Sequence, residues 1–169
     1  MALIKTVNGI TPSLGAGCFL ADNATLIGDV TCGKDCSFWF NSVTRGDVHQ
    51  IRIGDNTNIQ DGAIIHCTYQ TAPTTIGSNV SIGHRAIVHG CTIHDNTLIG
   101  MGAIVMDHAI VPENCLIAAG SIVLENSVLE SDYIYAGVPA KKVKKLSPEA
   151  FVQMVRRTAD NYKMYGSWY

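Results

Sequence analysis

Branched apolar residues recur at every sixth position through much of this chain of 169 residues. A six-residue period fits neither the 3.6-residue period of an α-helix nor the alternation of an ordinary β-hairpin. It is typical of a parallel β-helix, in which short strands stack coil upon coil and the recurring residues point inward. The longest unbroken series is Ile93, Ile99, Val105, Val111, Ile117 and Val123. Grouped in threes, the recurring residues predict coils at 32/38/44, 53/59/65, 76/82/88, 93/99/105 and 111/117/123.

This period resembles that of the known hexapeptide-repeat proteins, and the resemblance implies three hexads per triangular coil and left-handed coiling. The series are interrupted, because three extra residues separate 44 from 53 and five extra residues separate 65 from 76. These extra residues are predicted to form loops at a corner, most clearly the segment CTYQTAPTT at 67–75. The predicted fold is all-β: a left-handed parallel β-helix with a C-terminal α-helix.

The pattern changes toward the C-terminal end of the chain. Ser147 is a suitable N-cap, with Pro148 at the first helical position and Glu149 in the first turn. The helix should pack back on the prism or on a neighbouring subunit through an apolar stripe of Phe151, Met154, Val155 and Tyr162. We therefore divide the chain into a β-helix domain, 1–140, and a linker with an amphipathic helix, 141–169. The basic cluster KKVKK at 141–145 is interpreted as a solvated exit from the first domain.

Composition narrows the function classes. Hydrophobic residues make up 47% and aromatic residues 7% of the chain, so the core must come mainly from Ile, Val, Leu and Ala. The net charge is −2 and the two signs are mixed along the chain, so the sequence lacks the basic patch that binding to nucleic acid requires. No segment approaches the roughly 20 apolar residues that span a bilayer, and the N-terminus lacks the features of a signal peptide, so we expect no membrane association. The six cysteines fit no zinc-ribbon spacing, and we expect free thiols and a cytoplasmic location.

Three histidines have positions that indicate a metal site. His66 and His89, like Arg45, each directly follow the recurring residue of the third strand, so they should form one column with a spacing of about 4.8 Å. Because the ligand nitrogens of tetrahedral zinc lie about 3.3 Å apart, the two imidazoles are close enough to share one cation. His84 lies two residues after Ile82 on the second strand of its coil and therefore on a different face. In a threefold assembly, the third face of one prism can meet the second face of the next and complete the site.

The segments that contain these histidines, RGDVHQIRIGDNTNIQDGAIIH at 45–66 and IGHRAIVHG at 82–90, resemble the gamma-class carbonic anhydrases. The likeness is greatest to the short bacterial branch and covers nearly the whole chain. It implies a homotrimer with metal sites between subunits, whose ligands are His66, His84 and His89, with His84 donated by the neighbouring chain. The implied cofactor is Zn²⁺, although Fe²⁺ or Co²⁺ can occupy the same ligands. The implied reaction is reversible hydration of CO2 to bicarbonate by a zinc-bound hydroxide.

The resemblance also implies roles for the residues around the metal. Arg45 and Asp47 match the family's ion pair at the subunit interface. Gln60 matches the glutamine beside the metal-bound solvent. Asp61 has the same register in its hexad as His84 has in the next coil, so it can orient that imidazole.

Some positions depart from the family's pattern. Val48 stands where the archetypal enzyme has a glutamate, and residues 67–75 contain no acid where that enzyme carries a proton-shuttling glutamate. Slow turnover is therefore expected, because we interpret His49 as a corner residue and not as a substitute for the proton-shuttling glutamate. A tyrosine near the end of the prism, Tyr135 ahead of Tyr133, is expected to approach the metal of a neighbouring subunit.

Two other functions stay open. The segment AGVPAKKV at 136–143 resembles the part of hexapeptide acyltransferases that lies near coenzyme A, so an acyltransferase or a CoA thioesterase is one alternative. A non-catalytic trimeric scaffold that keeps a metal for structure is the other. Metal content, oligomer mass and CO2 hydration separate these hypotheses.

Overall fold

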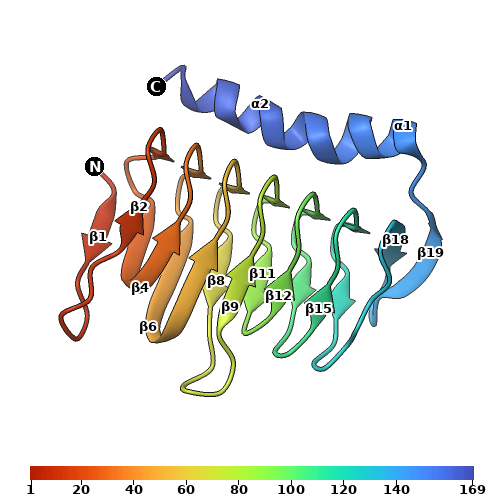
Figure 1. Cartoon of the computed structure of the whole chain (residues 1–169), viewed down its shortest axis with the longest axis horizontal. Helices are drawn as coiled ribbons and strands as arrows, with labels where there is room; N and C mark the ends of the chain where they lie inside the picture. Colours follow the sequence, from red (N-terminus) through yellow and green to blue (C-terminus); the bar gives the residue numbers. More distant parts are fainter.

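The computed structural model describes residues 1–169 and has the form of a β-solenoid with a C-terminal helix lying along it (Figure 1). Its strands form two sheets and pair in parallel, except for the last pair, β18 and β19. The 11-stranded sheet contains β1 (Leu3–Lys5), β2 (Ser13–Leu14), β4 (Thr25–Cys32), β6 (Val43–Ile53), β8 (Ile64–His66), β9 (Thr74–Ile76), β11 (Ile87–His89), β12 (Thr92–Ile93), β14 (Ile104–Val105), β15 (Ile110–Val111) and β17 (Ile122–Val123). The 8-stranded sheet contains β3 (Phe19–Leu20), β5 (Ser37–Phe38), β7 (Asn58–Ile59), β10 (Ser81–Ile82), β13 (Leu98–Ile99), β16 (Leu116–Ile117), β18 (Tyr133–Ala136) and β19 (Lys141–Lys145).

The register of the strands confirms the predicted coils. Each recurring residue pairs with the equivalent residue one coil away, and these side chains fill the interior of the solenoid. The first column is Cys32, Ile53, Ile76, Ile93 and Val111. The second is Phe38, Ile59, Ile82, Ile99 and Ile117. The third is Thr44, Ile65, Val88, Val105 and Val123.

One further coil precedes those that the sequence pattern predicted. Leu14 pairs with Cys32, Leu20 with Phe38 and Leu26 with Thr44. These leucines keep the six-residue interval, so the signal was present in the sequence. The prediction missed it because the coil that follows is marked by the weaker residues Cys32, Phe38 and Thr44.

The interruption between 44 and 53 is not a loop, and here the prediction was wrong. Residues 45–52 lie inside the continuous strand β6, which pairs with β4 on both sides of a register shift between Gly28 and Val30. The extra residues are absorbed as a bulge at the corner of the solenoid, where the two backbones approach closely. A Cβ on Gly28 would lie 2.5 Å from the carbonyl oxygen of Gly46, so only glycine fits there. By contrast, residues 67–73 of the predicted loop do form a loop between β8 and β9, whereas Thr74 and Thr75 already belong to β9 (Figure 1).

The expected linker at 141–145 is also part of the sheet. These residues form β19, which pairs antiparallel with β18 and is the last strand of the 8-stranded sheet. Every residue of β19 is exposed, and four of the five are lysines. Charged side chains on an edge strand discourage pairing with another chain, which gives this basic cluster a structural role.

The C-terminal helix begins as predicted, with the Ser147 side chain accepting a hydrogen bond from the backbone N of Ala150 at 3.2 Å. It consists of α1 (Pro148–Ala150), a π-helical segment η1 (Phe151–Arg156) and α2 (Arg157–Gly166). The helix packs on its own solenoid, along the 8-stranded sheet (Figure 1). Val155 is buried, but Met154 is 46% exposed, since the π-helical segment does not keep the expected stripe on one face. None of the helices is long and apolar enough to cross a membrane.

Candidate metal centre

His66 and His89 lie side by side on the third face of the solenoid. They end the neighbouring strands β8 and β11 and are direct partners in the register, as the column argument predicts. Nδ1 of His66 and Nε2 of His89 are 3.1 Å apart. This separation is close to the spacing of about 3.3 Å between ligand nitrogens of one tetrahedral zinc ion.

Each of these imidazoles is held by a carboxylate at its other nitrogen. Nε2 of His66 lies 3.1 Å from Oδ1 of Asp47, and Nδ1 of His89 lies 2.5 Å from Oδ1 of Asp107. A neutral imidazole that donates its one N–H to a carboxylate has an unprotonated second nitrogen. With both rings in this tautomer, the two facing nitrogens are both acceptors. A cation between them resolves this conflict, so the pair fits a metal ion.

The carboxylates that hold the imidazoles are strongly ionised. Burial by itself would raise the pKa of Asp47, but hydrogen bonds from Arg45 and His66 outweigh it and lower that pKa. The pKa of Asp107 is lowered in the same way: burial opposes the shift, and hydrogen bonds from Thr68 and His89 prevail. The carboxylates of Asp47 and Asp107 are therefore ionised and can accept a hydrogen bond from the N–H of an imidazole.

Burial lowers the pKa of His66, and the positive charge of Arg45 adds to this effect. The imidazole is consequently neutral at physiological pH, the protonation state in which it binds a metal. Arg45 forms its ion pair with Asp47 of the same chain, at 2.5 Å. The resemblance implies this pair at a subunit interface, and within one chain it positions the carboxylate that holds His66.

His84 follows β10 and belongs to the second face, apart from His66 and His89. Its Nδ1 lies 2.9 Å from Oδ2 of Asp61, the partner that the hexad register predicts. The side chain of Gln60 accepts a hydrogen bond from the backbone N of His84 at 3.2 Å and donates to Asn58 at 2.9 Å. Gln60 and Asp61 are thus grouped around His84.

Sequence reasoning missed Asp107 and Tyr162. Asp107 lies two residues after Val105, in the coil that follows His89, so an acid at that register was the available signal. Tyr162 carried no such signal, because it comes from helix α2. Its hydroxyl lies 3.3 Å from Nε2 of His84, and burial, together with the charge of Asp61, raises its pKa to about 12.

The structure does not support the expectation for Tyr135. Its side chain is 4% exposed and stacks on Ile117 in the core. Its hydroxyl accepts a hydrogen bond from the backbone N of Glu130 at 2.8 Å and donates to the carbonyl of the same residue at 3.2 Å. A buried hydroxyl with both partners in its own chain has nothing left to offer a neighbouring metal. We therefore leave Tyr135 out of the site; Tyr133 packs against Lys142, which lies 4.4 Å from its ring centroid.

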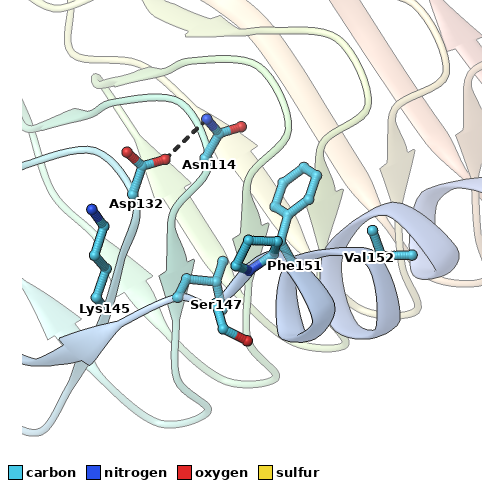
Figure 2. A pocket seen from close by; sticks show the side chains of 8 residues that line it. Asn114, Asp132, Lys145, Ser147, Phe151 and Val152 are labelled. Carbon is cyan, nitrogen blue, oxygen red and sulfur yellow. Dashed lines mark hydrogen bonds between the residues drawn. The ribbon is translucent and has the colours of Figure 1, made fainter.

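The largest pocket lies away from the histidines, at the start of the C-terminal helix (Figure 2). It has a volume of about 690 Å³, and Figure 2 shows Asn114 and Asp132 joined by a hydrogen bond of 3.1 Å on its wall. A smaller pocket, of about 410 Å³, reaches Gln60, His84 and Tyr162 between apolar side chains. His66 and His89 line neither pocket. A site shared between two copies of the chain would be open surface in one copy.

Comparison with known proteins relates this chain to one family. Residues 73–105 and 90–125 match the bacterial transferase hexapeptide family (six repeats). The chain is 43% identical over 167 residues to a carbonic anhydrase of Geobacillus kaustophilus, a match that covers 99% of this chain and 91% of that protein. It is 40% identical over 157 residues to the mitochondrial gamma carbonic anhydrase 2 of Arabidopsis thaliana, covering 90% of this chain and 56% of that protein. A solved hexapeptide transferase family protein from Anaplasma phagocytophilum superposes with a TM-score of 0.93 at 38% identity, covering 99% of this chain and 98% of that one.

Proposed function

Because this chain belongs to the gamma-class carbonic anhydrase family, we propose that it catalyses the reversible hydration of CO2 to bicarbonate at a divalent metal centre. We propose further that the centre lies between copies of the chain in a homotrimer. His66 and His89 come from one copy and His84 from the next. The observation that carries the proposal is the pair of imidazole nitrogens that face each other at 3.1 Å, each on a ring whose other nitrogen is held by a carboxylate.

The three histidines share one design. One ring nitrogen of each histidine lies against a carboxylate: Asp47 for His66, Asp61 for His84 and Asp107 for His89. The other nitrogen would be the metal ligand, and in His84 it must first leave the Tyr162 hydroxyl. Carboxylate partners of this kind orient metal-binding imidazoles and raise their basicity. The donor set of neutral imidazoles suits Zn²⁺ and also accepts Fe²⁺ or Co²⁺. When bound, such an ion supplies hydroxide at neutral pH by lowering the pKa of a water molecule.

The chain's own residues would bind and orient the substrate. The pocket beside His84 is lined mainly by apolar side chains, which suits the uncharged CO2 molecule. Gln60 is 5% exposed and lies at this pocket, where its amide can orient a small polar ligand. Asp61 fixes His84 so that Nε2 is the nitrogen available for ligation.

Proton export is the weak step of the proposed reaction. Residues 67–75 contain no acid, and Val48 is apolar, so this chain has no carboxylate at the positions that the family uses for proton transfer. His49 accepts a hydrogen bond at Nδ1 from the backbone N of Gln50 at 2.8 Å, which ties its ring to the corner. We therefore expect turnover below that of relatives with an acidic loop.

The test combines three measurements on protein purified without added metal: metal content, oligomer mass and stopped-flow CO2 hydration. The expected result is a metal-containing trimer and CO2 hydration that His84→Ala abolishes. Activity of the wild-type protein equal to that of His84→Ala would reject the proposal, as would a metal-binding monomer of 18.1 kDa. Thioester cleavage without hydration would favour an acyl-CoA enzyme, and bound metal with neither activity would favour a structural scaffold.

A further inference from the structure

Three cysteines form a cluster at the N-terminal end of the solenoid. The sulfur atoms of Cys18, Cys32 and Cys36 all lie within 4.8 Å of one another. The Sγ atoms of Cys18 and Cys32 are 3.8 Å apart. With a Zn–S bond of about 2.3 Å, two thiolates on one tetrahedral ion lie about 3.8 Å apart. The Cys18–Cys32 pair thus has the spacing of two ligands on one ion, and the third sulfur, of Cys36, lies within 4.8 Å of both.

The fold brings the thiols together at one corner of the first coils. Cys18 directly precedes β3 and Cys36 directly precedes β5, and these strands are paired in register, so the two residues are stacked. Cys32 ends β4 and lies on the other side of the short turn that leads to Cys36. The same corner column holds another cysteine, Cys115, several coils away, where no group of three thiols forms.

The cluster combines burial with access. Cys32 and Cys36 are 5% and 1% exposed, whereas Cys18 is half-buried. A pocket of about 340 Å³ under helix α2 is lined by Cys18 and Cys36. Lys163 of the helix forms an ion pair of 2.9 Å with Asp35 at this pocket. An ion can therefore reach the thiols through Cys18, and the protein surrounds it once bound.

We propose that Cys18, Cys32 and Cys36 form a second metal site, a trithiolate site for a thiophilic cation of the Zn²⁺ or Cu⁺ class. Soft thiolate ligands select these ions over the harder cations that carboxylates and carbonyls bind. The site is separate from the histidine centre, since it uses different residues, different coils and sulfur in place of nitrogen. It does not rest on the proposed carbonic anhydrase activity.

The electrostatics of the cluster agree with this assignment. Hydrogen bonding with the side chains of Cys32 and Cys36 lowers the pKa of Cys18, and the same coupling raises the pKa values of Cys32 and Cys36. Without a metal, the thiols of Cys18 and Cys36 donate to the backbone carbonyls of Gly33 at 3.3 Å and Gly54 at 3.0 Å. A bound cation releases these protons, as is general for thiolate sites.

The test uses Cd²⁺ as a probe on the full-length protein, stripped of metal with a chelator and kept reduced. Thiolate ligation produces an ultraviolet charge-transfer band that histidine ligation does not. The expected result is one equivalent of Cd²⁺ per chain with this band, retained in Cys115→Ser and lost in Cys18→Ser and Cys36→Ser. Retention of the band in His66→Ala would assign it to the sulfur site.

A second measurement uses only the wild-type protein and therefore does not depend on whether the cysteine variants fold. Cys18 of the wild-type protein should be protected from alkylation by Cd²⁺, as measured by mass spectrometry of the digested chain. Absence of the band, its persistence in Cys18→Ser, or equal alkylation with and without Cd²⁺ would overturn the proposal. So would a disulfide between two of the three cysteines in protein isolated without reductant, because that would make the cluster a redox pair.

Discussion

Nδ1 of His66 and Nε2 of His89 face each other across 3.1 Å from two hydrogen-bonded neighbouring strands. The residues are 23 positions apart in the chain, a separation that includes the loop at 67–73. The carboxylates of Asp47 and Asp107 hold the opposite edges of the two rings. This arrangement has the spacing that two ligands of one metal ion need.

The division of the ligands between two faces predicts complementation between inactive variants. His84→Ala lacks the ligand of the second face, and the double variant His66→Ala/His89→Ala lacks those of the third face. In a mixed trimer one of the three interfaces combines two intact faces, and about three quarters of the trimers from an equal mixture are mixed, so about one quarter of the wild-type activity should return. Stopped-flow CO2 hydration after joint refolding measures this return. A mixture of His66→Ala with His89→Ala is the matched control and should stay inactive, because both changes lie on the same face. Absence of recovered activity in the first mixture would contradict a shared site.

Removing the carboxylate behind His84 should weaken metal binding. In Asp61→Ala the imidazole loses the partner that lies 2.9 Å from its Nδ1, so its orientation and tautomer are no longer fixed. Loss of such a partner typically costs about 10- to 100-fold in metal affinity. Competition with a chromophoric chelator measures the affinity, and Asp22→Ala, whose side chain is 89% exposed, serves as the control. Equal affinities in Asp61→Ala and the wild-type protein would contradict the role assigned to Asp61.

The Tyr162 hydroxyl should compete with the metal for His84. It lies 3.3 Å from Nε2, the nitrogen that ligation requires, so a metal must displace it. Tyr162→Phe keeps the ring against Trp39 and removes one hydrogen bond worth about 1 kcal/mol, which should tighten metal binding about fivefold. Tyr165→Phe removes a hydroxyl from the adjacent ring and should leave the affinity unchanged. Weaker binding in Tyr162→Phe would mean that the hydroxyl supports the site.

Phe38 should dominate the stability of the N-terminal coils. Its side chain is fully buried and stacks between Leu20 and Ile59 in the second column. Phe38→Ala leaves a cavity in a packed interior and should lower the free energy of unfolding by about 3–5 kcal/mol. Urea denaturation at a fixed protein concentration measures the change. Phe151→Ala, at the partly exposed start of the C-terminal helix, should cost much less, and equal losses in the two variants would show that Phe38 is not a core anchor.

The amino-acid sequence was enough to predict the periodic part of the fold and the positions of His66 and His89 within it. An inward-pointing residue at every sixth position defines the columns, and His66 and His89 each follow a column residue by one. The same reasoning paired Asp61 with His84. It failed where the chain departs from the period: residues 45–52 stay in strand β6, residues 141–145 form an edge strand, and Tyr135 packs into the core.

The sequence by itself therefore determined the solenoid, the register of its coils and the column that joins His66 to His89, because these follow from short repeats whose stacking is local. The tertiary structure alone decided which distant groups meet: Tyr162 with His84, 78 residues apart, and the three sulfur atoms of Cys18, Cys32 and Cys36 at one corner. Those contacts depend on how helix α2 packs against the sheet and on how the turns direct side chains. No repeat encodes either feature, so they emerge only when the whole chain is folded.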